Sequence, residues 1–75
     1  MKNYTLEELQ KEFGGHWVKD DPRYYDCYDH NHDYMIVAYY ISSGTFHKAS
    51  VSDPKLSIEE VKRLIKIRIK LKNFS

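Results

Sequence analysis

The segment YMIVAYYISSGTFHKASV, residues 34–51, decides the fold of this chain. Its first half is rich in β-branched and aromatic residues, which favour a strand, and SSGT then predicts a tight turn. TFHKASVS, residues 45–52, indicates the returning strand, with Ser43 and Gly44 as the two loop residues. The centre of the molecule is therefore expected to be an antiparallel hairpin.

Two weaker strand signals precede this hairpin. HWVKD, residues 16–20, is ended by DDP, because proline cannot donate to a ladder, and YYDCY, residues 24–28, is rich in aromatics. DHNHD, residues 29–33, contains no apolar residue and is typical of a loop tip. The sequence therefore predicts an antiparallel sheet of three to four strands.

Helices are predicted at both ends of the chain. TLEE, residues 5–8, matches a capping box and opens a helix over residues 6–13, which GG then ends. SIEE, residues 57–60, is a second capping box and opens a helix that runs to about residue 72. The stretch IKIRIKLK, residues 65–72, alternates strictly, so a short helix feeding a strand remains the alternative. The order α-β-β-β-β-α predicts a single α+β domain over residues 1–75, with both helices on one face.

Composition limits the function classes. A chain of 75 residues builds one small core, and its single cysteine excludes an internal disulfide. The net charge of +1 hides an asymmetry: residues 1–53 carry five Lys or Arg against nine Asp or Glu, and residues 54–75 carry seven against two. No apolar run is long enough to span a bilayer, and glutamates stand where a signal peptide needs apolar residues. We therefore expect a cytoplasmic protein without a membrane partner.

The two faces of the predicted hairpin differ if Ser42 lies opposite Thr45, because opposite residues share a face. One face then carries Ile36, Ala38, Tyr40, His47, Ala49 and Val51, and the other carries Met35, Val37, Tyr39, Ile41 and Phe46. We expect the helices to cover the first face and leave the larger, aromatic second face half-exposed for a partner. The alternative is that the N-terminal segment, with Trp17, folds over the second face and completes the core.

Metal binding and catalysis are weakly supported. Cys27, His30 and His32, with His16 or His47 nearby, are suitable ligand types, but C-x2-H-x-H is not a zinc-finger spacing. The sequence shows no recognisable nucleophile with an oxyanion hole. It also shows no recognisable phosphate-binding loop. We therefore expect a non-enzymatic protein with no cofactor, no metal ligand and no catalytic residue.

The acidic, tyrosine-rich segment from Tyr24 to Tyr34 indicates a binding surface for a larger protein, such as one that itself binds nucleic acid. The residues predicted to contact this partner are Tyr24, Tyr25, Asp26, Tyr28, Asp29, Asp33, Tyr39, Ile41 and Phe46. Small size and many Lys, Asn, Ile and Tyr residues suit an AT-rich genome. We therefore expect a regulator or inhibitor of the phage or mobile-element type.

The C-terminal segment offers two further surfaces. Its apolar residues wrap more than half of the predicted helix, so Ile67, Leu71 and Phe74 are candidates for a homodimer contact. Its basic residues Lys62, Arg63, Lys66 and Lys70 would line one side and could meet phosphates. A nucleic-acid-binding accessory protein is therefore the alternative function.

Overall fold

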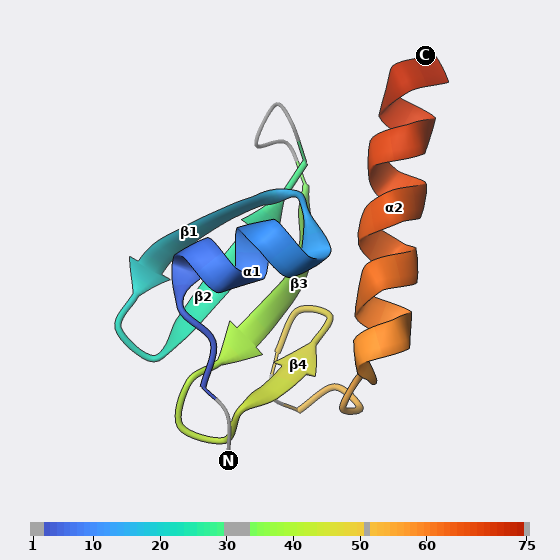
Figure 1. The fold of residues 1–75 in the computed structure, drawn as a ribbon. Coiled ribbons are helices and arrows are strands. Elements are labelled where there is room, and N and C mark those ends of the chain that lie inside the picture. Colours follow the sequence, from blue (N-terminus) through green and yellow to red (C-terminus); the bar gives the residue numbers. More distant parts are fainter. Residues whose placement is uncertain (1–2, 30–33, 51, 75) are drawn as a thin grey trace.

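The computed structural model describes residues 3–29, 34–50 and 52–74. Its elements are α1 (Leu6–Phe13), β1 (His16–Asp21), β2 (Tyr24–Tyr28), β3 (Met35–Tyr40), β4 (Thr45–His47) and α2 (Ile58–Phe74), as Figure 1 shows. The strands form one antiparallel meander in the order β1-β2-β3-β4. The predicted α+β class and the order of elements are confirmed.

Both predicted capping boxes form and fix where the helices begin. At α1 the Glu8 amide donates to Thr5 Oγ1 (3.2 Å), and Glu8 Oε1 accepts from the Thr5 amide (2.9 Å). Ser57 and Glu60 make the same reciprocal pair at the start of α2, with distances of 3.0 and 3.1 Å. From there α2 continues to Phe74, so residues 65–72 are helical and the strand alternative is wrong. Their alternating pattern does not produce a strand, because no glycine, proline or turn residue interrupts the helix that precedes them.

The central hairpin has a longer turn than the sequence predicted. Tyr40 pairs with Thr45, so the turn spans residues 41–44 and not Ser43 and Gly44 alone. The Gly44 amide donates to the Tyr40 carbonyl (2.8 Å), and Gly44 has a φ of 68°, which an L side chain adopts only with strain. The register moves by two residues, which keeps the predicted division of side chains between the two faces.

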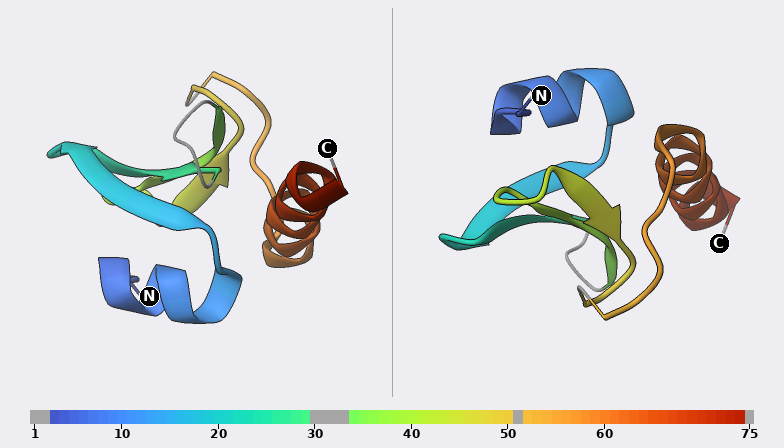
Figure 2. Two further views of the ribbon diagram at one scale, coloured as in Figure 1. Left: turned by 90° about the horizontal axis from the view of Figure 1, so that it is seen from above. Right: turned by 90° about the horizontal axis from the view of Figure 1, so that it is seen from below.

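The helices, however, cover the face that was expected to remain open. Cross-strand rows on this face are Trp17–Cys27–Val37 and Tyr25–Tyr39–Phe46. Figure 2 shows α1 lying across one face of the sheet, and its buried residues Leu9 and Phe13 join these rows in the core. The alternative in which the N-terminal segment completes the core on this face is therefore confirmed. The expectation that helices cover Ala38 and Tyr40 is wrong.

Aromatic rings hold α1 onto the sheet. The Phe46 ring lies 4.8 Å from that of Tyr39, 5.2 Å from Phe13 and 5.9 Å from Tyr4, measured between centroids. The Trp17 ring completes this group, and its Nε1 donates to the Gly14 carbonyl (2.8 Å). Aromatic pairs of this kind stabilise by about 0.5–1.5 kcal/mol beyond the burial of their area. Many of the aromatic side chains therefore pack in the core of the protein.

The second helix stands beside the sheet and not over its centre (Figures 1 and 2). Its residues Val61 and Ile65 are buried in the same core as Leu9 of α1. The backbone of Gly15 passes directly beneath Ile65, and a Cβ atom at this glycine would lie 3.4 Å from Ile65 Cγ2. This close approach positions α2 against the connection between α1 and β1.

A β-bulge changes the alternation at the start of β3. Cys27 pairs with Val37 and Tyr28 with Met35, so Ile36 is the extra residue. Ile36 therefore joins the core beside α2, whereas Met35 shares the side of Tyr28. The predicted placement of Met35 with Val37 is wrong for this reason.

The two edges of the sheet are finished differently. Beyond β4, Phe46 forms an isolated bridge with Leu56, whose amide donates to the Phe46 carbonyl (2.8 Å). At the other edge, β1 carries the exposed charges Lys19 and Asp20, and its pairing with β2 is irregular between Val18 and Asp21. Within the described residues, no further strand pairs with the outer side of β1.

Candidate functional site

The sheet face opposite α1 carries no helix in the part of the chain that the structure describes (Figure 2). The register places three cross-strand rows there: Tyr28–Met35, Val18–Asp26–Ala38 and Tyr24–Tyr40. Tyrosines and carboxylates dominate this side, since Asp20 joins it through its contact with Tyr28. We call this surface the tyrosine face and define it by Val18, Asp20, Tyr24, Asp26, Tyr28 and Tyr40.

Asp26 lies at the centre of the tyrosine face and lacks a partner for one of its oxygens. The residue is only 4% exposed, and its Oδ1 atom is buried without a hydrogen bond. Burial, followed by the negative charges of Asp20 and Asp21, raises the pKa of Asp26 to about 6. At neutral pH this carboxylate is therefore mostly ionised, and a cationic hydrogen-bond donor is the group that would satisfy it.

Tyrosine rings form the walls around this carboxylate. Tyr24 and Tyr28 are the neighbours of Asp26 on the same side of β2, and the Tyr24 ring packs 5.1 Å from that of Tyr40. Tyr28 donates its hydroxyl proton to Asp20 Oδ2 (3.3 Å). Burial and the nearby Asp26 charge raise the pKa values of Tyr24 and Tyr28, so both phenols stay neutral and keep their donors.

One cation of the chain already lies at the rim of this face. The Arg23 guanidinium sits 5.8 Å from the centre of the Tyr24 ring. It also donates to both carboxylate oxygens of Asp21, at 2.9 and 3.0 Å, which holds it at the turn between β1 and β2. The side chain of Arg23 is 77% exposed, so a partner carboxylate or the solvent can reach it.

At the β4 end, the segment after β4 closes the face (Figure 2). His47 Nδ1 lies 2.9 Å from the Asp53 carbonyl, which can only accept, so Nδ1 carries the proton. Its Nε2 atom then accepts from Thr45 Oγ1 (2.9 Å). Asp53 in turn accepts from the amides of Ala49 and Ser50. His47 is thus a buried structural residue, and the open area lies over β1, β2 and β3.

Three of the predicted partner-binding residues lie on the tyrosine face, namely Tyr24, Asp26 and Tyr28. The others lie elsewhere: Tyr39 and Phe46 are buried in the core, Tyr25 and Ile41 are half-buried against it, and Asp29 is buried at the end of β2. Tyr39 and Phe46 are therefore corrected from surface to core residues. Asp33 lies outside the described residues.

Two residues of the tyrosine face were not predicted. Tyr40 was expected beneath a helix, and Asp20 was explained as part of a turn. The signal for Tyr40 was present, because it alternates in step with Ala38, but it gave no indication of which face the helices cover. The position of Asp20 depends on the irregular pairing between β1 and β2, and no sequence pattern indicates this irregularity.

Cys27 is buried on the covered face. Burial raises the pKa of its thiol to about 12, so the thiol stays protonated at neutral pH. His30 and His32 lie outside the described residues. Within residues 3–29, 34–50 and 52–74, His, Cys, Asp and Glu side chains form no group of three that would hold a metal ion.

The predicted surfaces of α2 are described only in part. Lys62, Arg63 and Lys66 are exposed, as is Ile67 at 48%. The side chains of Lys70, Leu71 and Phe74 lie outside the described residues. Over the part of the chain with described structure, neither helix is long and apolar enough to cross a membrane.

Comparison with known proteins leaves these surfaces as the basis for any functional conclusion. The chain matches no family model, no curated protein and no solved structure.

Proposed function

We propose that this chain is a small non-enzymatic binding protein that docks through its tyrosine face onto a basic surface of a larger protein. A cytoplasmic regulator or inhibitor, of the type encoded by phages and mobile elements, fits this role. The partner would insert an arginine or lysine side chain between the tyrosine rings to reach Asp26. A partner that normally binds nucleic acid offers such side chains, because it uses them to contact phosphates.

The observation that carries this proposal is the buried, unpartnered Oδ1 atom of Asp26. A buried carboxylate without a donor costs stability, and asparagine, alanine or valine would avoid much of that cost at this position. Its surroundings suit a cation, since Asp20 and Asp21 add negative potential and the neighbouring Tyr24 and Tyr28 rings offer π faces. Tyrosine also supplies a large contact area and loses little side-chain entropy on binding, because it has few rotatable bonds.

A titration with short peptides tests the proposal. The isotope-labelled protein would be followed by two-dimensional NMR while an arginine-rich, a lysine-rich or a glutamate-rich nonapeptide is added. We expect saturable shifts with the arginine peptide at the amides of Tyr24, Asp26 and Tyr40, weaker shifts with the lysine peptide and none with the glutamate peptide. Asp26→Asn should weaken arginine-peptide binding by at least about tenfold, as is usual when one member of a buried charged pair is removed.

The matched control is Glu7→Gln, which removes an exposed carboxylate on α1 and leaves the tyrosine face intact. Equal loss of binding in Asp26→Asn and Glu7→Gln would mean that only net charge matters and would contradict the proposal. Binding that persists unchanged in Asp26→Asn would contradict it as well.

The alternative function, nucleic-acid binding, is favoured by the exposed cations Lys62, Arg63 and Lys66 on α2. The sequence carries no acidic residue after Glu60, so this helix presents an uninterrupted positive charge. The triple variant Lys62→Glu, Lys66→Glu and Lys70→Glu should abolish binding to duplex or single-stranded oligonucleotides if this alternative holds. The same variant should leave arginine-peptide binding intact if the tyrosine face is the functional surface.

A further inference from the structure

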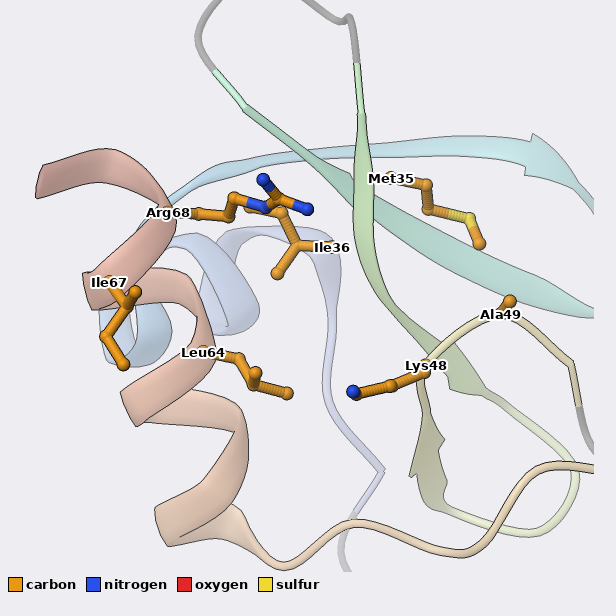
Figure 3. Close-up of a pocket in the computed structure, with 7 residues that line it drawn as sticks. All are labelled: Met35, Ile36, Lys48, Ala49, Leu64, Ile67 and Arg68. Atoms are coloured by element: carbon orange, nitrogen blue, oxygen red, sulfur yellow. The ribbon is translucent and has the colours of Figure 1, made fainter. Parts of the chain in front are cut away.

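A groove separates α2 from the sheet and contains none of the six residues that define the tyrosine face, although Met35 at its border shares the side of Tyr28. It has a volume of about 360 Å³, which lies at the lower end of the range of roughly 300–1,000 Å³ for small-molecule sites. Figure 3 shows Leu64 of α2 and Lys48 of the segment after β4 pointing toward each other across it, with Ile36 of β3 and the end of Arg68 above them in this view. The groove is open to solvent along one side and is not an enclosed cavity.

The walls of the groove are apolar. Ile36 is buried, Leu64 is half-buried, and both belong to or pack against the core, so they cannot turn away from the groove without loss of packing. Ala49 adds a small side chain on the sheet side, which leaves space between the helix and the β4 segment. An apolar chain of a ligand placed there would lose water from both of its sides.

Two cations from opposite sides reach the same groove. Lys48 extends from the segment after β4, and Arg68 extends from α2 (Figure 3). Among the residues that the structure describes, no Asp or Glu lines the groove. Arg68 is positioned by stacking over the Tyr34 ring, with 5.0 Å between the guanidinium carbon and the ring centre. In the described part of the chain, the groove therefore combines an apolar wall with two positive charges and no carboxylate.

We propose that this groove binds a monocarboxylate with a short apolar body, such as a medium-chain fatty acid. The carboxylate would accept from Lys48 and Arg68, and the acyl chain would lie against Leu64 and Ile36. A phosphate or sulfate group fits less well, because its larger hydration shell would have to be removed against apolar walls. This site is independent of the proposed docking of a basic protein on the tyrosine face.

Octanoate is a suitable probe, since it stays monomeric at millimolar concentration. Two-dimensional NMR should show saturable shifts at the amides of Ile36, Ala49 and Leu64, with a Kd on the order of 1 mM for a ligand of this size in an open groove. Octanol and octylammonium carry the same chain without the negative charge and should bind about fivefold more weakly, which is the upper limit of what one solvent-exposed charge pair contributes.

Variants at the two cations distinguish specific binding of octanoate in the groove from its general electrostatic attraction to a basic helix. Lys48→Gln and Arg68→Gln should each weaken octanoate binding by about threefold to fivefold, and the double variant should lose saturable binding. The matched control, Arg63→Gln, removes an exposed cation of the same helix that does not line the groove, and it should bind as the native chain does. Circular dichroism would verify that each variant is folded.

Three outcomes would overturn the proposal. Octanol that binds as tightly as octanoate would show that the groove recognises only apolar surface. An equal loss in Arg63→Gln and Arg68→Gln would show that the charge of the whole helix, and not the groove, attracts the ligand. Absence of saturable shifts at millimolar octanoate would remove the site.

Discussion

The two faces of the sheet are built from neighbouring residues of the same strands, yet they differ in whether a helix covers them and in the ionisable groups they carry. Val37 and Tyr39 belong to the core on the covered face, whereas Ala38, which is also buried, and Tyr40 point to the opposite side, which no helix covers in the described structure. Cys27 on the covered face is neutral, and Asp26, the residue before it, is an ionisable group without a full set of partners. The difference teaches that one face of this small sheet carries the apolar core, whereas the opposite face carries the surface that we propose for binding.

This division has an energetic consequence. The covered face gathers the aromatic cluster and the buried residues of both helices, so nearly all stabilising contacts lie on one side. The tyrosine face keeps a buried carboxylate that costs stability in the free protein. Substitutions should therefore have large effects on unfolding at the covered face and small ones at the tyrosine face.

The largest contrast is expected between two adjacent tyrosines. Tyr39→Ala leaves a cavity among Tyr4, Tyr25 and Phe46 and should lower the free energy of unfolding by about 3–5 kcal/mol. Tyr40→Ala removes a half-buried ring from the open side and should cost about 1 kcal/mol or less. Urea denaturation followed by circular dichroism measures both. Similar losses in the two variants would contradict the division of the faces.

The next effect concerns two adjacent glycines that both have positive φ values, 75° at Gly14 and 84° at Gly15. Alanine at either position should cost about 1–2 kcal/mol from backbone strain alone. At Gly15 the added Cβ would also lie 2.6 Å from Cys27 Sγ, whereas nothing lies within 4 Å at Gly14. Gly15→Ala should therefore be clearly the more destabilising in thermal unfolding, and equal melting temperatures would argue against the close approach on the covered face.

A smaller effect is expected from the titration of Asp26. Its pKa is raised from 3.8 to about 6, so the folded protein holds this proton more tightly than the unfolded chain does. This contribution to stability is complete below about pH 4 and is lost as the pH rises through 6, by about 1 kcal/mol after allowance for solvent screening. Asp26→Asn should lack this loss when urea midpoints are compared at pH 4.5 and 7.5.

The comparison with the native chain isolates the Asp26 contribution. Asp21 and Glu60 have lowered pKa values, because Arg23 and the Ser57 backbone stabilise their charged forms. They add stability as the pH rises, which is the opposite slope, and they do so in both proteins. If the difference between Asp26→Asn and the native chain does not change with pH, the carboxylate is well solvated and the account of the tyrosine face is wrong.

The smallest effect is expected at the rim. Arg23→Gln breaks the ion pair with Asp21, but the arginine side chain is largely exposed, and such pairs contribute little to stability. Its urea midpoint should match that of the native chain within the error of the measurement. A clear loss would mean that the tyrosine face contributes to stability in the same way as the covered face.

The sequence predicted the elements well because their signals are local. Thr5 with Glu8 and Ser57 with Glu60 mark helix starts through contacts three residues apart. The apolar run of β3 needs no knowledge of its neighbours to indicate a strand. The division of side chains between the two faces also survived a wrong turn length, because the error was an even number of residues.

What the sequence did not predict depends on contacts between distant residues. The choice of the covered face rests on how α1 folds back, with Tyr4 reaching Tyr39 and Phe46 across more than thirty residues. The bulge at Ile36, which moves Met35 to the other side, has no local signature. For the tyrosine face, alternation along β2 places Tyr24, Asp26 and Tyr28 on one side, but alternation alone could not tell which of the neighbouring residues are buried.

The way the sheet ends has a consequence for the behaviour of the protein at high concentration. A bare, regular border strand is a template on which a second molecule can add its own strand, and repeated addition gives fibrils. Here Leu56 occupies one border by bridging to β4, while charge and an interrupted ladder make the β1 border a poor template. Neither edge therefore favours the repeated addition of further copies, so the tyrosine face that we propose for partner binding lies on a sheet that resists self-association through its edges.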